Sequence, residues 1–114
     1  MADCLFCKII ERTIPSTVVY EDDRVMAFTD IDPQAPTHVL IVPKRHIATL
    51  NDITTEDDQI VGELVRSAAA IAKERGFSAQ GYRTSFNTNR GAGQTVLHIH
   101  LHLLGGGPLT WPPG

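Results

Sequence analysis

Three histidines occupy alternate positions near the end of the chain, at His98, His100 and His102. Their alternation with apolar residues predicts a β-strand within Thr95–Leu104. Successive side chains of a strand point to opposite faces, so the three imidazoles should share one face at intervals of about 7 Å. The core-facing side would then be formed by Ile99, Leu101 and Leu103. Imidazoles exchange protons and bind metals and phosphate near neutral pH, so this row predicts a chemical site.

Three kinds of chemistry suit such a row, and spacing alone does not choose among them. His98 and His100 can ligate a metal ion in a hydrolase, with a third ligand from His38, His46 or Asp30. One histidine can instead attack phosphorus and form a phosphoramidate-like covalent intermediate. The site can also bind a nucleotide without turning it over.

Glycine-rich segments flank the predicted strand. Gly105–Pro108 must leave it as a turn, which places the site near a strand end where loops converge. Before the strand lies Asn89–Thr95, where Gly91 and Gly93 can expose backbone N–H groups to an anion. This loop is not a dinucleotide-binding fingerprint, because a strand follows it where a helix is required.

Size and charge exclude several classes of protein. The 114 residues predict one domain over residues 1–114, and 42% hydrophobic with 20% charged residues is typical of a globular chain. A net charge of −3 and the lack of a Lys/Arg run argue against a nucleic-acid polymer as partner. No apolar run reaches membrane-spanning length, and the N-terminus lacks a signal-peptide pattern, so we expect a cytoplasmic protein with no membrane partner.

The remaining pattern predicts an α+β fold, with antiparallel strands and a long helix packed on one face. The long helix spans Glu56–Arg75, with Thr54 or Thr55 as cap and Gly76 as stop. A short helix follows Asp3, its expected N-cap, and ends before Ile14. Strands are expected over residues 17–20, 24–29, 38–42, 81–88 and 95–104, and a proline-punctuated loop over 30–36.

The motif HIHLHLL at residues 98–104 resembles the signature of the histidine-triad (HIT) nucleotide-binding family. The resemblance extends over nearly the whole chain, through DIDPQAPTH at 30–38, GQT at 93–95 and WPPG at 111–114. It is closest to the Hint branch of that family, the purine nucleoside phosphoramidases. Thr95 stands where many members have serine, which preserves the hydroxyl group. The resemblance implies a HIT-like, five-stranded antiparallel sheet with one long helix and a short N-terminal helix.

The resemblance also implies an activity, the hydrolysis of purine nucleoside phosphoramidates, with AMP-lysine-like or aminoacyl-adenylate compounds as substrates. His100 would be the nucleophile toward the α-phosphorus and would carry a nucleotidyl-histidine intermediate that water hydrolyses. A strand carbonyl or His98 would fix the tautomer of His100. His102 would contact phosphate and help to deliver a proton, and His38 would support the triad from the adjacent strand. No cofactor is expected for this catalysis.

Nucleotide-binding residues follow from the same resemblance. Asp30 would accept the ribose hydroxyls, and the phosphate oxygens or the bridging atom would be held by Asn87, Gly93 and Thr95. The slot for the purine base would be lined by Leu5, Phe6, Ile9, Phe28 and Ile31. Members of the family are homodimers, which implies an interface of the long helix and the strand at 81–88, with Trp111 near the partner's site.

Two cysteines, Cys4 and Cys7, form a C-x-x-C motif. In a cytoplasmic protein this spacing favours reduced thiols or metal ligands over a structural disulfide. C-x-x-C is half of a structural zinc site, and the resemblance to cysteine-bearing members suggests His46 and His98 as the other two ligands. A packed free thiol and a redox pair are the alternatives.

Overall fold

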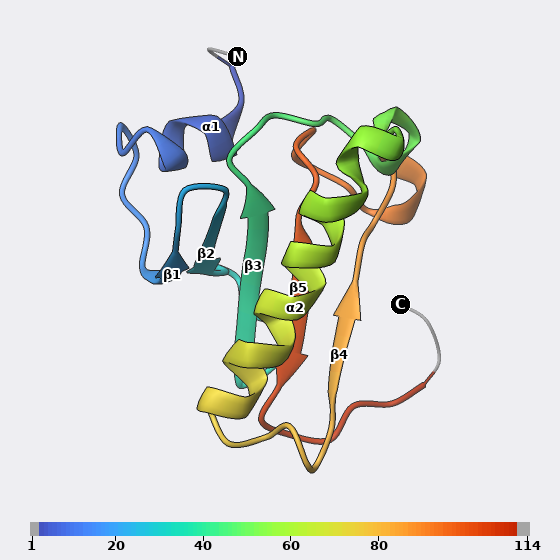
Figure 1. Cartoon of the computed structure of the whole chain (residues 1–114). Coiled ribbons are helices and arrows are strands. Elements are labelled where there is room, and N and C mark those ends of the chain that lie inside the picture. Colours follow the sequence, from blue (N-terminus) through green and yellow to red (C-terminus); the bar gives the residue numbers. More distant parts are fainter. Residues whose placement is uncertain (1–2, 112–114) are drawn as a thin grey trace.

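The computed structural model describes residues 3–111 of the chain (Figure 1). Two α-helices, α1 (Leu5–Ile10) and α2 (Asp58–Glu74), accompany a five-stranded antiparallel sheet. The sheet order is β1-β2-β3-β5-β4, with strands β1 (Val18–Glu21), β2 (Val25–Thr29), β3 (Thr37–Pro43), β4 (Tyr82–Ser85) and β5 (Leu101–Gly105). Short 3₁₀ turns occupy Leu50–Asp52, Thr55–Asp57 and Arg90–Ala92. The expected α+β fold with five antiparallel strands is confirmed, while Pro112–Gly114 of the quoted C-terminal motif lie outside the described residues.

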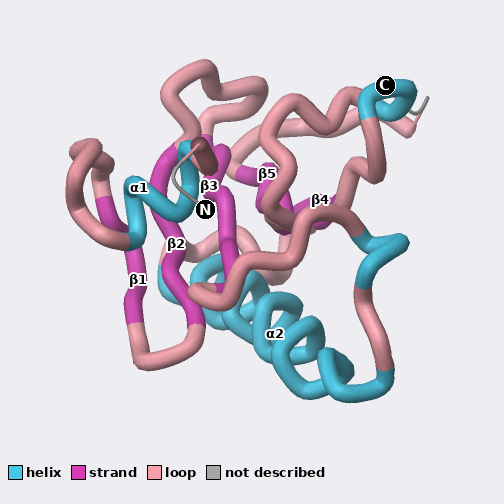
Figure 2. Tube along the Cα trace, turned by 90° about the horizontal axis from the view of Figure 1, so that it is seen from above, coloured by secondary structure: helices cyan, strands magenta, loops and turns pink. Residues whose placement is uncertain are grey.

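Strands β2 and β3 are covered on both faces, which explains why they lack an alternating polar pattern. One face packs against α2 in a large core that includes Val25, Ile41 and Leu64. The opposite face packs against α1 in a smaller core formed by Phe6, Ile9, Met26, Phe28, Leu40 and Val42. The two helices therefore lie on opposite sides of the sheet, as the view from above also shows (Figure 2).

The helix ends differ from the prediction because polar caps compete with the first helical turns. Thr54 accepts a hydrogen bond from the backbone N–H of Glu56, and its own N–H donates to Asp57, so a 3₁₀ turn precedes α2. The long helix consequently begins at Asp58, two residues later than Glu56. The N-cap of α1 is Cys4, whose Sγ accepts the N–H of Cys7 at 3.3 Å, and the prediction of Asp3 was wrong.

The final strand is shorter than the alternation predicted, since β5 begins only at Leu101. His98 and His100 therefore precede the strand, and only His102 belongs to it. The preceding segment bonds to a loop instead of to the ladder, because the N–H of Ile99 donates to the carbonyl of Ile47 at 2.7 Å. The alternation of facing nevertheless persists in this segment, with the apolar residues in the core beside α2. The histidines thus gather where β5 begins, at the end of β5 opposite to Gly105.

Strand β4 is also shorter than the predicted 81–88, because only Tyr82–Ser85 pair with β5. It forms one edge of the sheet, and β1 forms the other. Within residues 3–111, no helix is long and apolar enough to cross a membrane.

Candidate active site

A pocket of about 620 Å³ opens between α1 and the beginning of β5. The sequence-predicted residues that line it are Leu5, Phe6, Ile9, Phe28, Asp30, Ile31, Gly93, Thr95, His100 and His102. His38 and His98 lie behind these residues, and Asn87 is not among the lining residues. The pocket thus combines an apolar half, formed largely by α1 and β2, with a polar half that contains two imidazoles.

The tautomer of His100 follows from one hydrogen bond. Its Nδ1 lies 2.8 Å from the backbone carbonyl oxygen of His98, and a carbonyl only accepts. Nδ1 must therefore carry the proton, which leaves the lone pair on Nε2 free. Burial lowers the pKa of His100, so the ring is neutral at neutral pH. An unprotonated imidazole nitrogen beside a pocket is the form required of a nucleophile or a base.

The tautomer of His102 is fixed through His38. The backbone N–H of Gln34 donates to Nδ1 of His38 at 3.0 Å, so the proton of the neutral ring sits on Nε2. That Nε2 lies 2.9 Å from Nδ1 of His102, which accepts the hydrogen bond. His102 then carries its proton on Nε2, a buried atom without a hydrogen-bond partner among the described residues. Since burial lowers the pKa of His102 to about 4, this ring is a neutral donor available to a ligand.

Asp30 is held by its own loop at the edge of the pocket. Its Oδ1 accepts the backbone N–H of Asp32 at 2.8 Å, and its Oδ2 lies 3.4 Å from Nε2 of His38. The carboxylate is 18% exposed and lines the pocket, so it can accept further hydrogen bonds from a ligand.

The glycine-rich loop is organised by Gln94, a residue that the sequence analysis did not assign. Its side chain is buried and accepts the N–H of Asn89 at 2.8 Å. Its Nε2 donates to the carbonyls of Ala48 at 2.8 Å and Val96 at 3.0 Å. These bonds hold Gly93, whose φ of +91° favours glycine, at the pocket wall. A lone glutamine within a glycine-rich run was the available signal for this role.

Several other lining residues were also missed. Five come from irregular segments whose path a local pattern does not predict, Ile14, Pro15, Ser16, Thr17 and Val96, and two come from strands, Thr29 of β2 and Leu40 of β3. Two of them, Ser16 and Thr17, add hydroxyl groups to the apolar half of the pocket. Gly91, by contrast, is not among the lining residues.

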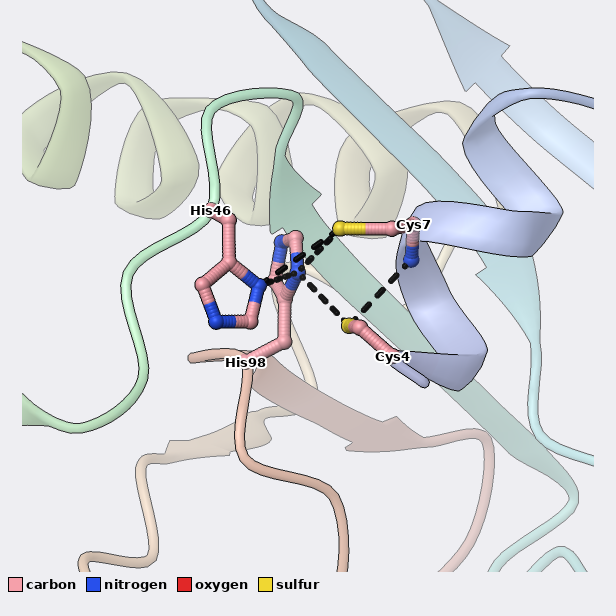
Figure 3. Close-up of side chains that lie close together, drawn as sticks. All are labelled: Cys4, Cys7, His46 and His98. Carbon is pink, nitrogen blue, oxygen red and sulfur yellow. Dashed lines mark hydrogen bonds between the residues drawn. The ribbon is translucent and has the colours of Figure 1, made fainter. Parts of the chain in front are cut away.

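A second cluster lies directly behind the pocket and contains Cys4, Cys7, His46 and His98 (Figure 3). Nε2 of His98 donates to the carbonyl of Pro43 at 2.8 Å, which leaves Nδ1 unprotonated toward the cluster. This Nδ1 lies 3.2 Å from Nδ1 of His46, 3.3 Å from Sγ of Cys4 and 3.6 Å from Sγ of Cys7. Sγ of Cys7 also lies 3.5 Å from Nδ1 of His46.

These separations match the donor set of a structural zinc ion. Zinc bonds of about 2.3 Å to sulfur and 2.0–2.1 Å to nitrogen, in a tetrahedron, place two nitrogens about 3.3 Å apart and a nitrogen and a sulfur about 3.5 Å apart. The Cys₂His₂ cluster therefore fits zinc in both ligand type and spacing. His98 thus contributes its ring to this cluster and its backbone carbonyl to the hydrogen bond with His100.

The chain is similar to known proteins along almost its full length. Residues 11–109 match the family model described as the HIT domain. The chain is 54% identical over 107 residues to a purine nucleoside phosphoramidase of Escherichia coli K12, covering 94% of this chain and 90% of that protein. An uncharacterised HIT-like protein of Synechococcus elongatus is 51% identical, covering 98% and 97% of the two chains.

Solved structures agree with this assignment. A HIT family hydrolase from Legionella pneumophila superposes with a TM-score of 0.96 at 55% identity, covering 98% of this chain and 100% of that chain. A histidine triad protein from Clostridium difficile superposes with a TM-score of 0.93 at 47% identity, covering 96% of each chain. The three histidines, the fold and these relatives lead to one conclusion, that the chain belongs to the HIT family.

Proposed function

We propose that this protein hydrolyses the P–N bond of purine nucleoside phosphoramidates through a covalent intermediate on His100. The observation that carries the proposal is the fixed tautomer of His100, which leaves a neutral Nε2 beside a pocket of nucleotide size. The relative from Escherichia coli, named a purine nucleoside phosphoramidase, supports the same activity.

In the first step, Nε2 of His100 attacks the α-phosphorus and the P–N bond breaks. The electron pair of that bond leaves with the amine nitrogen, which must take up a proton. We propose that His102 helps to deliver that proton, because the residue lines the pocket, its Nε2–H has no hydrogen-bond partner among the described residues, and the hydrogen bond from His38 fixes its tautomer. In the second step, water attacks phosphorus and the bond between phosphorus and Nε2 of His100 breaks. The proton that water gives up replaces the one that the amine took up, the nucleoside monophosphate leaves, and the unmodified ring of His100 is restored.

The nucleotide is bound along the length of the pocket. The base lies in the apolar half lined by Leu5, Phe6, Ile9, Phe28 and Ile31. Asp30 accepts the two ribose hydroxyls, and Gly93 with Thr95 holds the phosphate oxygens. Asn87 has no part in this proposal, because it does not line the pocket.

One observation favours a second candidate, a metal-dependent hydrolase. Ligand atoms of Asp30, His38 and His102 lie within 4.8 Å of one another, close enough for one ion. The tautomers argue for the first proposal, because Nε2 of His38 and Nδ1 of His102 already share one proton in a 2.9 Å hydrogen bond. A nucleotide-binding protein without catalysis is the third candidate.

A homodimer is part of the proposal, with α2 and β4 at the interface. Both elements carry exposed apolar side chains, Val65 on α2 and Tyr82 on β4, and β4 is an edge strand. Trp111 is 81% exposed and contacts Arg83 of β4 at 5.9 Å from its ring centroid. An exposed indole beside that edge supports its placement near the partner's site.

We further propose that Cys4, Cys7, His46 and His98 hold a structural zinc ion, which takes no part in the chemical step. The ion would supply only a rigid connection between α1 and the body of the protein. Thiolate ligands persist in a reducing compartment, which is consistent with a cytoplasmic protein. Cell fractionation measures that location directly.

Replacing His100 by alanine should lower the turnover of an adenosine phosphoramidate by several orders of magnitude, because the nucleophile is lost. Circular dichroism should show an intact fold, since the opposite face of the segment is unchanged. Mass spectrometry of quenched wild-type reactions should detect a nucleotidyl adduct on His100. Near-normal turnover in the variant would refute the assignment, and an adduct-free wild type inhibited by chelator at saturating substrate would favour the metal hydrolase.

Replacing Asp30 by asparagine should weaken AMP binding roughly tenfold, because two charge-assisted hydrogen bonds to the ribose are lost. Asparagine keeps an oxygen for the N–H of Asp32, so the loop should be retained. Calorimetry with 2′,3′-dideoxyadenosine monophosphate is the matched control and should show little change. Equal losses for the two ligands would leave Asp30 with a role in the loop alone.

Native mass spectrometry of protein purified without chelator should find about one zinc ion per subunit. Cys4→Ser and Cys7→Ser should each lose the ion, because serine is a poor zinc ligand. A metal-free wild type that is stable and active would contradict the zinc site.

Deleting Leu109–Gly114 should change the preference among amine leaving groups while AMP affinity changes little, because Trp111 would act at the partner's site. Steady-state kinetics with a series of phosphoramidates measures the preference, and sedimentation measures the dimer. A monomeric wild type, or an unchanged preference, would count against this arrangement.

A further inference from the structure

Helix α1 is attached to the rest of the protein by few polar contacts. Among the described residues, the side-chain hydrogen bonds that join residues 3–14 to the rest of the chain come from Cys4, Cys7 and Arg12. Arg12 pairs with Glu21 at the exposed end of this segment. A helix of six residues has little stability of its own, so its position depends on side-chain contacts.

The same helix forms a wall of the nucleotide pocket. Its residue Phe6 is 4% exposed and lines the pocket together with Leu5 and Ile9. The ring centroid of Phe6 lies 5.0 Å from that of His100 and 6.0 Å from that of His98. One aromatic ring therefore contacts the proposed nucleophile, a proposed zinc ligand and the base slot.

His46 stands apart from the nucleotide pocket. It follows β3 in the chain and lines a neighbouring cavity, and it is not among the residues around the nucleotide. Its Nδ1 nevertheless completes the cluster with the two cysteines of the α1 segment (Figure 3). Two of the four ligands thus come from the pocket wall and two from the body of the protein.

We propose that His46 is a positioning residue for nucleotide binding, and that metal and nucleotide reinforce each other's binding through α1. By joining the two cysteines to His46 and His98, the metal would fix the position of α1 and so hold Phe6 and Ile9 in contact with the nucleotide. This inference rests on the proposed function and on the zinc site, and goes beyond both. It makes the metal a determinant of substrate affinity, without any part in the chemical step.

Thermodynamic linkage makes the coupling reciprocal. If zinc raises AMP affinity by some factor, AMP must raise zinc affinity by the same factor, and couplings between sites are typically about five- to 150-fold. We expect a factor of about tenfold here, because α1 supplies one wall of the pocket while Asp30, His100 and the glycine-rich loop remain in place.

The test compares wild type and His46→Ala, both full length and supplied with zinc. AMP should bind the variant about tenfold more weakly by calorimetry, and KM for an adenosine phosphoramidate should rise similarly. The kcat should stay within about twofold, because the hydrogen bond between His100 and the carbonyl of His98 does not involve His46. His46→Cys, which restores a zinc ligand, should recover the affinity.

Two matched variants separate the coupling from a general loss of binding. Asp30→Asn should weaken AMP binding equally with and without zinc, because Asp30 lies outside α1. Phe6→Ala should weaken AMP binding. It should also reduce the ratio of AMP affinities measured with and without zinc, because the side chain that transmits the coupling from α1 to the nucleotide is lost. Far-ultraviolet circular dichroism should verify that each protein is folded.

The reciprocal measurement uses wild type alone and so remains decisive where a variant unfolds. Competition with a chromophoric chelator should show that AMP raises zinc affinity by the factor that calorimetry gives for AMP. If folded wild type binds AMP equally well with and without zinc, the coupling is overturned, while the proposed function and the zinc site are left standing. Absence of AMP binding in both states would overturn the proposed function as well, and absence of zinc binding would overturn the metal site and the coupling together.

Discussion

The site depends on one hydrogen bond, from Nδ1 of His100 to the backbone carbonyl of His98, at 2.8 Å. A neutral imidazole in solution populates two tautomers of similar energy, and only one of them leaves Nε2 unprotonated. A carbonyl acceptor removes that choice, and burial lowers the pKa so that a second proton does not bind. The segment before β5 is what brings this carbonyl within reach, because Ile99 is bonded to the loop after β3. The irregular backbone at this point is therefore part of the chemistry.

The two-sided sheet explains how so small a protein combines a tightly packed core with an open pocket. On one face, α2 covers a large core that fixes β2, β3 and β5. On the other face, the smaller core leaves room for a pocket, and the short α1 completes its wall. Of the three histidines, His102 belongs to β5, and His98 and His100 belong to the irregular segment before it. Part of the apolar wall of the pocket belongs to the short α1, so imidazoles attached to the sheet lie opposite apolar side chains from a separate element.

The local sequence pattern predicted much of this structure, but it did not predict the contacts between residues that lie far apart in the chain. The facing of Ile99 and Leu101 into the core followed from alternation, because facing is a property of neighbouring residues. The start of β5 did not, since it depends on a bond to Ile47, about fifty residues away in the chain. The role of Gln94 was not predicted for the same reason, because its side chain donates to the carbonyl of Ala48, which is distant in the sequence. Within the cysteine cluster, C-x-x-C was visible as half of a site, and the family resemblance supplied both histidines.

The sulfur of Cys4 has two separate roles, since it caps α1 and also belongs to the Cys₂His₂ cluster for which we propose zinc. Serine and aspartate are good N-caps but poor partners for a Cys₂His₂ zinc ion. A single exchange of Cys4 for one of these residues would therefore remove one of the four proposed zinc ligands while the helix keeps its cap. Forms of this fold with and without the proposed metal would then differ by one substitution at this position. In a form without the metal, tighter apolar packing beneath Phe6 would have to hold α1 against the body of the protein in place of the ion.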